Sequence, residues 1–423
     1  MKTTLGLLSV LLFSSLLSAQ VILNAELRPR LEYRHGFKTL YGAADKPATF
    51  ISQRTRLNAL HQTEKLSFYV SLQNVRVWGD VPQLNLSDKN ANTLQQAWAE
   101  LKFSKGGGLR MGRQELVYDD SRILGNVNWA QQARSHDAAV FRFSDSTQKL
   151  HLGIAYNQEK ENVVGNTYLL QKNYKALQFL WYHKESNKFA WSGLFLNNGL
   201  QFIATKPNEQ DAIRYSHTAG LNVRYKGKKL FLLGEGYYQF GKDIANQTLN
   251  ATLLRLEAKV VLHQNFQFLM GFENISGNDA NKPKVGTNQA FNPFYGTNHK
   301  FNGLMDYFYV GNHLNTVGLS DLYWSLNIKS QSKANYRFDL HRFAADEAIA
   351  EVDNKKLGWE WDAIYSRPLA ANTALAIGYS HFFPASPLEN LKQNKTGETN
   401  NWFWLMITIK PTLFVHNPNS QTQ

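Results

Sequence analysis

Residues 23–35 show the clearest alternation between apolar and polar side chains in the chain. One face carries Leu23, Ala25, Leu27, Pro29, Leu31 and Tyr33. The opposite face carries Asn24, Glu26, Arg28, Arg30, Glu32 and Arg34. A period of two places successive side chains on opposite sides of an extended strand, and no α-helix produces it. The sequence therefore predicts a β-strand with one apolar and one charged face.

The same alternation recurs far along the chain, at 266–273, 357–365 and 402–410. After residue 19 there is no run of 18 apolar residues, so the sequence predicts no membrane-spanning helix. Mean hydropathy is low, at −0.41. In a transmembrane β-barrel only every second side chain faces lipid, so mean hydropathy stays low while alternation stays strong. We therefore expect an all-β, outer-membrane type of barrel.

The connections between the expected strands are alternately short and long, as they are in outer-membrane barrels. Short polar turns are expected near 63–65, 104–108, 145–148, 185–188, 226–228, 263–265, 331–333 and 370–372. Long connections are expected near 36–49, 79–93, 117–135, 159–173, 198–211, 241–250, 278–315, 345–354 and 385–399. This rhythm predicts about 18 antiparallel strands with both termini in the periplasm. Sixteen strands remain an alternative, because 189–202 and 304–316 alternate poorly.

The first 19 residues have the pattern of a secretory signal peptide. Lys2 provides a basic start, Leu5 to Leu17 is apolar, and Ser18-Ala19 offers small residues for cleavage. The apolar run is too short to cross a membrane as a helix. We expect residues 1–19 to be removed and the protein to reach the outer membrane of a Gram-negative cell.

The expected barrel covers residues 20–414, and residues 415–423 form a polar tail. The last expected strand ends at Leu413-Phe414. An aromatic end of this kind is commonly read by the barrel-assembly machinery, which is therefore one expected partner. Because the apolar faces of the strands would face the membrane, outer-membrane lipids are a second expected partner.

Composition and motifs argue against an enzyme. Cys is absent, which excludes disulfides, thiolate metal sites and a Cys nucleophile. The chain lacks H-E-x-x-H, G-x-S-x-G and P-loop motifs. His299 with Asp306, or the pair Asp119 and Asp120, could act at the outer rim, but carboxylates in a basic loop are more often salt-bridge partners. We expect no catalysis, no metal and no cofactor.

Lys and Arg number 46 against 33 Asp and Glu, for a formal charge of +13. These basic residues follow barrel alternation and no nucleic-acid-binding motif, so we expect no nucleic-acid partner.

The charged face of the first expected strands places arginines in the lumen. We expect Arg28 and Arg30 from the first strand, Arg54 and Arg56 from the second and Arg76 from the third. Arg binds carboxylates and phosphates with two parallel hydrogen bonds, and basic rings select anions in pores. The alternative is wall bracing, in which these arginines pair with carboxylates. The available carboxylates are Glu26, Glu32, Glu100 and Glu235.

The segment 112–143 interrupts the alternation between two clear strands. It contains Gly112 and Gly125, which permit tight backbone, and many oppositely charged side chains that can pair. We expect a loop of fixed shape that folds into the lumen. An outer loop with surface ion pairs is the alternative.

Two blocks resemble the bacterial alginate export family of outer-membrane barrels. The first is GRQELVYDD at 112–120, continued by Arg122, Leu124-Gly125, Trp129, Gln131, Arg134 and Asp137. The second is FNPFYGTNHKFNGLMDYF at 291–308, which is similar to the late loop of the family. The resemblance implies an 18-stranded barrel whose basic constriction, narrowed by inward loops, conducts an acidic polysaccharide passively. It also implies that Arg113, Asp120, Arg122 and Arg134 lie in or beside that constriction.

The resulting functional hypothesis is a monomeric channel for passive diffusion of an acidic, alginate-like polysaccharide or oligosaccharide. A general or small-anion-selective porin is the main alternative. A structural or adhesin barrel and an outer-membrane enzyme are weaker ones. The expected substrate path consists of Arg28, Arg30, Arg54, Arg56, Arg76, Arg113, Asp120, Arg122 and Arg134.

Overall fold

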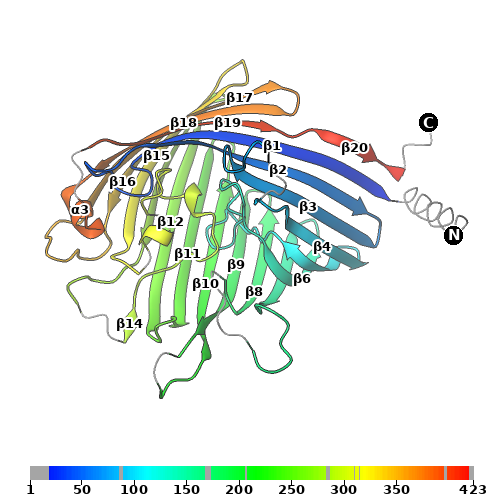
Figure 1. The fold of residues 1–423 in the computed structure, drawn as a ribbon, viewed down its shortest axis with the longest axis horizontal. Helices are drawn as coiled ribbons and strands as arrows, with labels where there is room; N and C mark the ends of the chain where they lie inside the picture. Colours follow the sequence, from blue (N-terminus) through cyan, green and yellow to red (C-terminus); the bar gives the residue numbers. More distant parts are fainter. Residues whose placement is uncertain are drawn as a thin grey trace, which may run out of the picture.

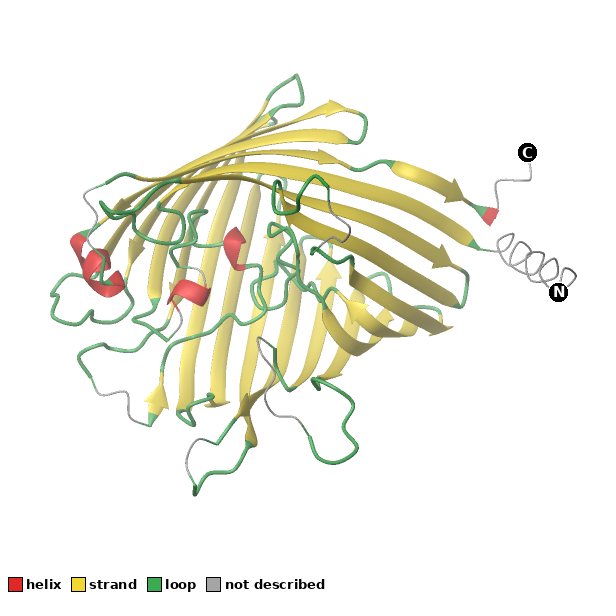
Figure 2. Ribbon diagram, viewed as in Figure 1, coloured by secondary structure: helices red, strands yellow, loops and turns green. Residues whose placement is uncertain are grey.

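The chain forms one closed antiparallel β-barrel with 18 wall strands (Figures 1 and 2). This computed structural model describes residues 19–84, 89–166, 173–204, 207–282, 286–308, 310–313, 315–394 and 398–418. The first and last wall strands close the barrel, with Leu27 opposite Ile409 and Glu32 opposite Trp404. The predicted fold class and the larger predicted strand number are confirmed.

The wall strands follow chain order around the barrel. They are β1 (Gln20–His35), β2 (Ala48–Gln62), β3 (Leu66–Val77), β4 (Thr93–Ser104), β5 (Gly107–Gln114), β6 (His136–Ser144), β7 (Gln148–Tyr156), β8 (Ala176–Ser186), β9 (Phe189–Phe202), β10 (Ala212–Lys226), β11 (Leu230–Lys242), β12 (Thr248–His263), β13 (Phe266–Ile275), β15 (Leu319–Lys329), β16 (Asn335–Ala344), β17 (Lys356–Ala370), β18 (Thr373–Pro384) and β19 (Asn400–Ile409).

Five smaller elements complete the fold. β14 (Thr287–Asn288) pairs with β12, and β20 (Thr412–His416) continues the direction of β19 and pairs with β1. The helices are η1 (Asn298–Lys300), α2 (Val310–His313) and α3 (Ser386–Lys392). Among the described residues, no helix is long and apolar enough to cross a membrane.

The connections distinguish the two ends of the barrel. Eight turns at one end, here called the short-turn end, fall at 63–65, 105–106, 145–147, 187–188, 227–229, 264–265, 330–334 and 371–372. β1 begins and β20 ends at this same end (Figure 1). The remaining connections leave the opposite, long-loop end. Of the two poorly alternating segments, 189–202 is strand β9, whereas 304–316 lies in a long connection and adds no strand.

Side chains of the wall alternate between an exposed apolar outer face and a polar lumen face. On β12, Leu254 and Leu256 are 48% and 51% exposed, while Arg255 between them is 5% exposed. This is the pattern expected where lipid covers the outside of a barrel. The predicted signal peptide lies outside the described residues except for Ala19. The predicted tail starts within β20, and 419–423 lie outside the described residues.

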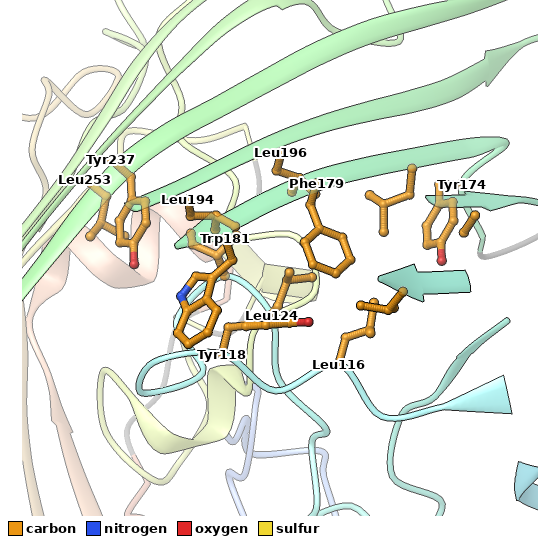
Figure 3. Packing of buried hydrophobic residues seen from close by; sticks show 14 of the residues in the cluster. Leu116, Tyr118, Leu124, Tyr174, Phe179, Trp181, Leu194, Leu196, Tyr237 and Leu253 are labelled. Carbon is orange, nitrogen blue, oxygen red and sulfur yellow. The ribbon is translucent and has the colours of Figure 1, made fainter. Parts of the chain in front are cut away.

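Two connections from the long-loop end fold into the lumen. We call 115–135 the first inward loop and the described residues of 276–318, which are 276–282, 286–308, 310–313 and 315–318, the second inward loop. Leu116, Tyr118 and Leu124 of the first loop pack against Phe179 and Trp181 of β8 (Figure 3). The prediction that segment 112–143 folds inward is confirmed for its middle part.

The second inward loop has its own apolar anchor on another part of the wall. Met305, Tyr307 and Phe308 are buried with Phe343 of β16 and Phe382 of β18. Each loop is therefore fixed to the wall by hydrophobic packing rather than suspended in the lumen.

Candidate functional site

Buried arginines of β1 and β2 bind the backbone of the first inward loop. Arg28 donates from Nη1 to the Asn128 carbonyl at 2.9 Å and from Nη2 to the Trp129 carbonyl at 3.2 Å. Arg30 Nη1 donates to the Trp129 carbonyl at 2.8 Å. Arg54, which is 0% exposed, donates to the side-chain oxygen of Asn128 at 3.0 Å. These three predicted site residues come together and hold the loop in place.

The same arginines also pair with carboxylates of β1. Arg54 Nε donates to Glu26 at 3.0 Å, and Arg30 Nε donates to Glu32 at 2.9 Å. Glu32 in addition accepts from Arg34 at 2.8 Å. The contacts expected for wall bracing therefore exist, and they orient the guanidinium groups that clamp the loop.

Three other predicted arginines lie in different surroundings: Arg56 and Arg76, predicted from strand alternation, and Arg113, which the family resemblance implies. Arg56 lines a small lumen cavity, which is described below. Arg76 shares a face of β3 with Phe68, which is 48% exposed, and Arg113 shares a face of β5 with Met111, which is 43% exposed. Both of these arginines therefore lie on the outer side of the wall, away from the loop clamps.

Loop residues Asp120 and Arg122 connect the first inward loop to the opposite wall. Arg122 is 1% exposed and donates from Nη2 to Glu273 of β13 at 2.8 Å and to Asn302 of the second inward loop at 3.2 Å. Asp120 binds Arg255 of β12. Burial raises the pKa of Asp120, but the Arg255 and Lys300 charges outweigh this and hold the pKa below its ordinary value.

The two inward loops also bind each other through their backbones. Gly125 donates to the Tyr295 carbonyl at 2.9 Å, and Thr297 donates to the Ser121 carbonyl at 2.8 Å. A Cβ on Gly296 would lie 2.1 Å from the Arg122 carbonyl oxygen, so this close approach requires glycine. Arg134 donates to the Gly296 carbonyl at 3.1 Å. The loops thus form one connected body across the lumen.

The His299 and Asp306 pair lies inside this body. Their side chains are 2.8 Å apart, and His299 stacks on Trp129 with ring centroids 4.8 Å apart. His299 is 7% exposed and Asp306 4% exposed. The geometry makes them packing partners of the constriction rather than a site at the outer rim.

A cavity of about 930 Å³ lies on the short-turn side of this body, against β7 to β16. Its basic lining residues are Lys149, Lys188, Arg224, Lys226, Arg255, Lys259, Lys300 and Arg337. Its acidic lining residues are Asp119, Asp120, Glu185, Glu257, Glu273, Asp321 and Asp339. The two signs are nearly equal in number, so the pairing of each group decides which charges face the cavity.

Most of these carboxylates already have a cationic or imidazole partner. Arg255 pairs with Asp120, and further pairs are Arg255 with Glu257 at 2.7 Å, Arg337 with Asp339 at 2.7 Å, Arg122 with Glu273 at 2.8 Å and His341 with Asp321 at 3.0 Å. The ammonium groups of Lys149, Lys188, Lys226 and Lys259 make no hydrogen bond or ion pair within the described part of the chain. Sequence reasoning missed these lysines, although the inward alternation of β7, β10 and β12 carries Lys149, Lys226 and Lys259; Lys188 lies in the turn between β8 and β9.

Metal binding finds no support in the geometry. Within the ranges described, no three His, Asp or Glu side chains are placed to hold a metal ion.

Comparisons with known proteins agree with this architecture. A family model described as alginate export matches residues 19–401. Among solved structures, OccAB4 of Acinetobacter baumannii is similar at 13% identity and a TM-score of 0.62, covering 94% of this chain and 98% of that one. OccK2 (OpdF) of Pseudomonas aeruginosa, solved in complex with glucuronate, is similar at 10% identity and a TM-score of 0.59, covering 93% and 98%.

A third structure, OccK11 (OpdR) of Pseudomonas aeruginosa, has 12% identity and a TM-score of 0.58, with 94% of this chain and 96% of that one covered. At such identities the structural likeness shows the fold. A search of curated proteins found no match. The family match spans almost the whole barrel, and the chain therefore belongs to the alginate export family of outer-membrane β-barrels.

Proposed function

We propose that this outer-membrane channel conducts an acidic polysaccharide or oligosaccharide by passive diffusion, as a monomer with its short-turn end in the periplasm. One observation carries the proposal. Lys149, Lys226 and Lys259 line the lumen cavity without an ion-pair partner among the described residues, whereas the carboxylates around them are largely paired. The cavity therefore offers unneutralised positive charge to a passing carboxylate.

The inward loops would limit the size and shape of what passes. They are fixed by buried arginines and by apolar packing, so the constriction is a built part of the barrel and needs no moving lid. A carboxylated chain would move by exchanging one basic partner for the next. Contacts of about 0–1 kcal/mol each, screened over about 8 Å, bind weakly enough for release.

The substrate class is supported by two comparisons. The description of the matching family model is alginate export, and the similar barrel OccK2 was solved in complex with glucuronate, a single uronic acid. A small-anion porin is the second candidate, because unpaired lysines attract any anion. An enzyme is disfavoured at the constriction, since the buried carboxylates Glu26 and Glu273 beside the first inward loop are held in ion pairs with arginines.

Planar bilayer recordings separate these candidates. We expect ohmic steps carried mainly by anions, and we expect an oligouronate to block them at concentrations where a neutral maltooligosaccharide of equal length does not. Equal block by both sugars would favour a general porin. Anion-selective steps that neither sugar blocks would favour a small-anion porin.

A further inference from the structure

A second lumen cavity of about 240 Å³ lies on the opposite wall, between β1 to β4 and the first inward loop. It shares no lining residue with the larger cavity. Its lining includes Arg56, Asn58, Tyr69, Gln96, Asn126 and Lys410. At roughly 30 Å³ per water molecule, its volume corresponds to about eight waters. The cavity is therefore of the size of one sugar ring rather than of a polymer segment.

Arg56 lines this cavity and has an unused hydrogen-bond donor. The residue is 8% exposed, and its Nε donates to the Gln73 side-chain oxygen at 2.7 Å, which fixes the guanidinium plane. Gln73 is fixed in turn by donating to the Gln132 carbonyl at 3.1 Å. Arg56 Nη2 is buried and has no hydrogen-bond partner among the described residues. Buried polar groups without a partner are uncommon and call for an explanation.

Asn58 brings a complementary unused acceptor. Its amide nitrogen donates to Asn24 at 2.7 Å, while its buried side-chain oxygen has no partner within the described ranges. A ligand that suits the cavity thus presents an acceptor to Arg56 and a donor to Asn58. A sugar with a carboxylate and free hydroxyls has both groups.

The two carboxylates of the lining are already engaged. Glu26 is bound by Arg54 and by Lys410, the latter at 3.3 Å. Glu115 accepts from the amides of Gln95 and Asn126, each at 2.8 Å. Neither carboxylate bridges to Arg56, and the Lys410 side chain is 54% exposed. Arg56 and Lys410 are therefore the cations that a bound carboxylate would meet.

The cavity lies directly on the short-turn side of the loop clamps. Asn24 and Glu26 precede Arg28 on β1, and Asn58 follows Arg54 on the antiparallel strand β2. On both strands the cavity residues therefore lie nearer the short-turn end than the arginines that bind the loop carbonyls. Tyr69 completes the lining and stacks on Trp98 at a centroid distance of 5.4 Å, which fixes its ring. An aromatic ring of fixed orientation beside amides suits the apolar and polar sides of a sugar.

We propose that this cavity is a subsite for one uronate-type sugar unit at the short-turn side of the constriction. Its carboxylate binds Arg56 through the terminal guanidinium nitrogens, its hydroxyls bind Asn58 and Gln96, and its ring lies against Tyr69. The proposal rests on the proposed channel function and adds to it the place where a sugar unit is seated before it enters the constriction.

The test uses D-glucuronate as the probe and glucose as its neutral counterpart. In planar bilayers, wild-type protein is expected to show brief current blocks with glucuronate added from the short-turn side, and much weaker ones with glucose. Arg56→Gln is expected to weaken glucuronate binding about tenfold or more, because a charge-assisted pair is lost. Arg56→Lys keeps the charge and is expected to fall in between.

A matched control is Arg342→Gln. Arg342 of β16 lies on the outer face, with its guanidinium 5.7 Å from the Trp359 ring centroid, so its loss removes one arginine without touching the cavity. Both variants are checked for heat-modifiable migration, and calorimetry with glucuronate in detergent repeats the binding measurement without current.

Equal glucuronate affinity in wild type and Arg56→Gln, or equal binding of glucose and glucuronate, would overturn the subsite and leave a water-filled cavity. Oligouronate block without glucuronate binding would also remove the subsite but keep the channel function. Calorimetric glucuronate binding that depends on Arg56, in a protein that gives no channels, would keep the subsite and remove the proposed channel function.

Discussion

The guanidinium group of Arg30 lies over the indole ring of Trp129, 4.1 Å from its centroid, and donates to the carbonyl oxygen of the same residue at 2.8 Å. A single arginine of the first wall strand thus holds both the side chain and the backbone of the first inward loop. The positive lumen face of β1 is consequently used to build the constriction as well as to line it.

Arg30→Met should loosen the constriction. The change removes one of the arginines that bind the Glu32 carboxylate, and it removes a hydrogen-bond donor to the Trp129 carbonyl. Breaking one side of a buried ion pair costs about 3–5 kcal/mol. We expect a lower temperature of heat-modifiable unfolding together with larger and noisier single-channel conductance. Unchanged conductance would mean that the loop is held by its apolar anchors alone.

Gly296→Ala should separate the two inward loops. The added methyl group would lie 2.1 Å from the Arg122 carbonyl oxygen, so the two loops must move apart. The backbone hydrogen bonds between the loops then lengthen or break. The barrel wall is not involved, and β-type circular dichroism should stay as in wild type. Single-channel conductance should rise. Gly236→Ala serves as the control for conductance. Nothing lies within 4 Å of the added Cβ, and Gly236 stands on β11 between the buried residues Glu235 and Tyr237, so it lies on the outer face of the wall.

Asp120→Asn should raise conductance at neutral pH by breaking the pair with Arg255. In wild type the pKa of Asp120 is lowered by Arg255 and Lys300 against the raising effect of burial. A lowered pKa means that the stabilising charge is present above the ordinary carboxyl pKa of about 3.9 and is lost only as pH falls through the lower folded value. Wild-type conductance should therefore stay constant from about pH 7 to about pH 4. A rise in wild-type conductance near pH 5 would argue against a lowered pKa of Asp120 and its ion pair with Arg255.

The barrel and its strand number could be predicted because lipid imposes a period of two that most wall strands repeat, and because short and long connections alternate along the chain; β9 at 189–202 shows the period poorly. The lumen position of Arg28, Arg30 and Arg54 followed from the same period. The lumen position predicted for Arg76 is not supported, because the alternation of Phe68 and Leu72 on the same strand puts Arg76 on the outer face.

Contacts between distant segments could not be predicted from one sequence. Arg122 and Glu273 are 151 positions apart, and the second inward loop offered no alternation from which to infer its place. Nor can alternation tell whether an inward arginine binds a substrate or a loop carbonyl. That distinction depends on where the loop backbone lies, as it does for Arg28.

The charge of the larger cavity offers the most direct test of the account. The variant Lys149→Gln with Lys226→Gln and Lys259→Gln removes three lumen charges without breaking an ion pair among the described residues, so folding should be kept. Reversal potentials in a salt gradient should show anion preference in wild type and a clear loss of it in the triple variant, with weaker oligouronate block. An unchanged reversal potential and unchanged block in the folded triple variant would contradict the proposal that these lysines carry an acidic substrate through the barrel.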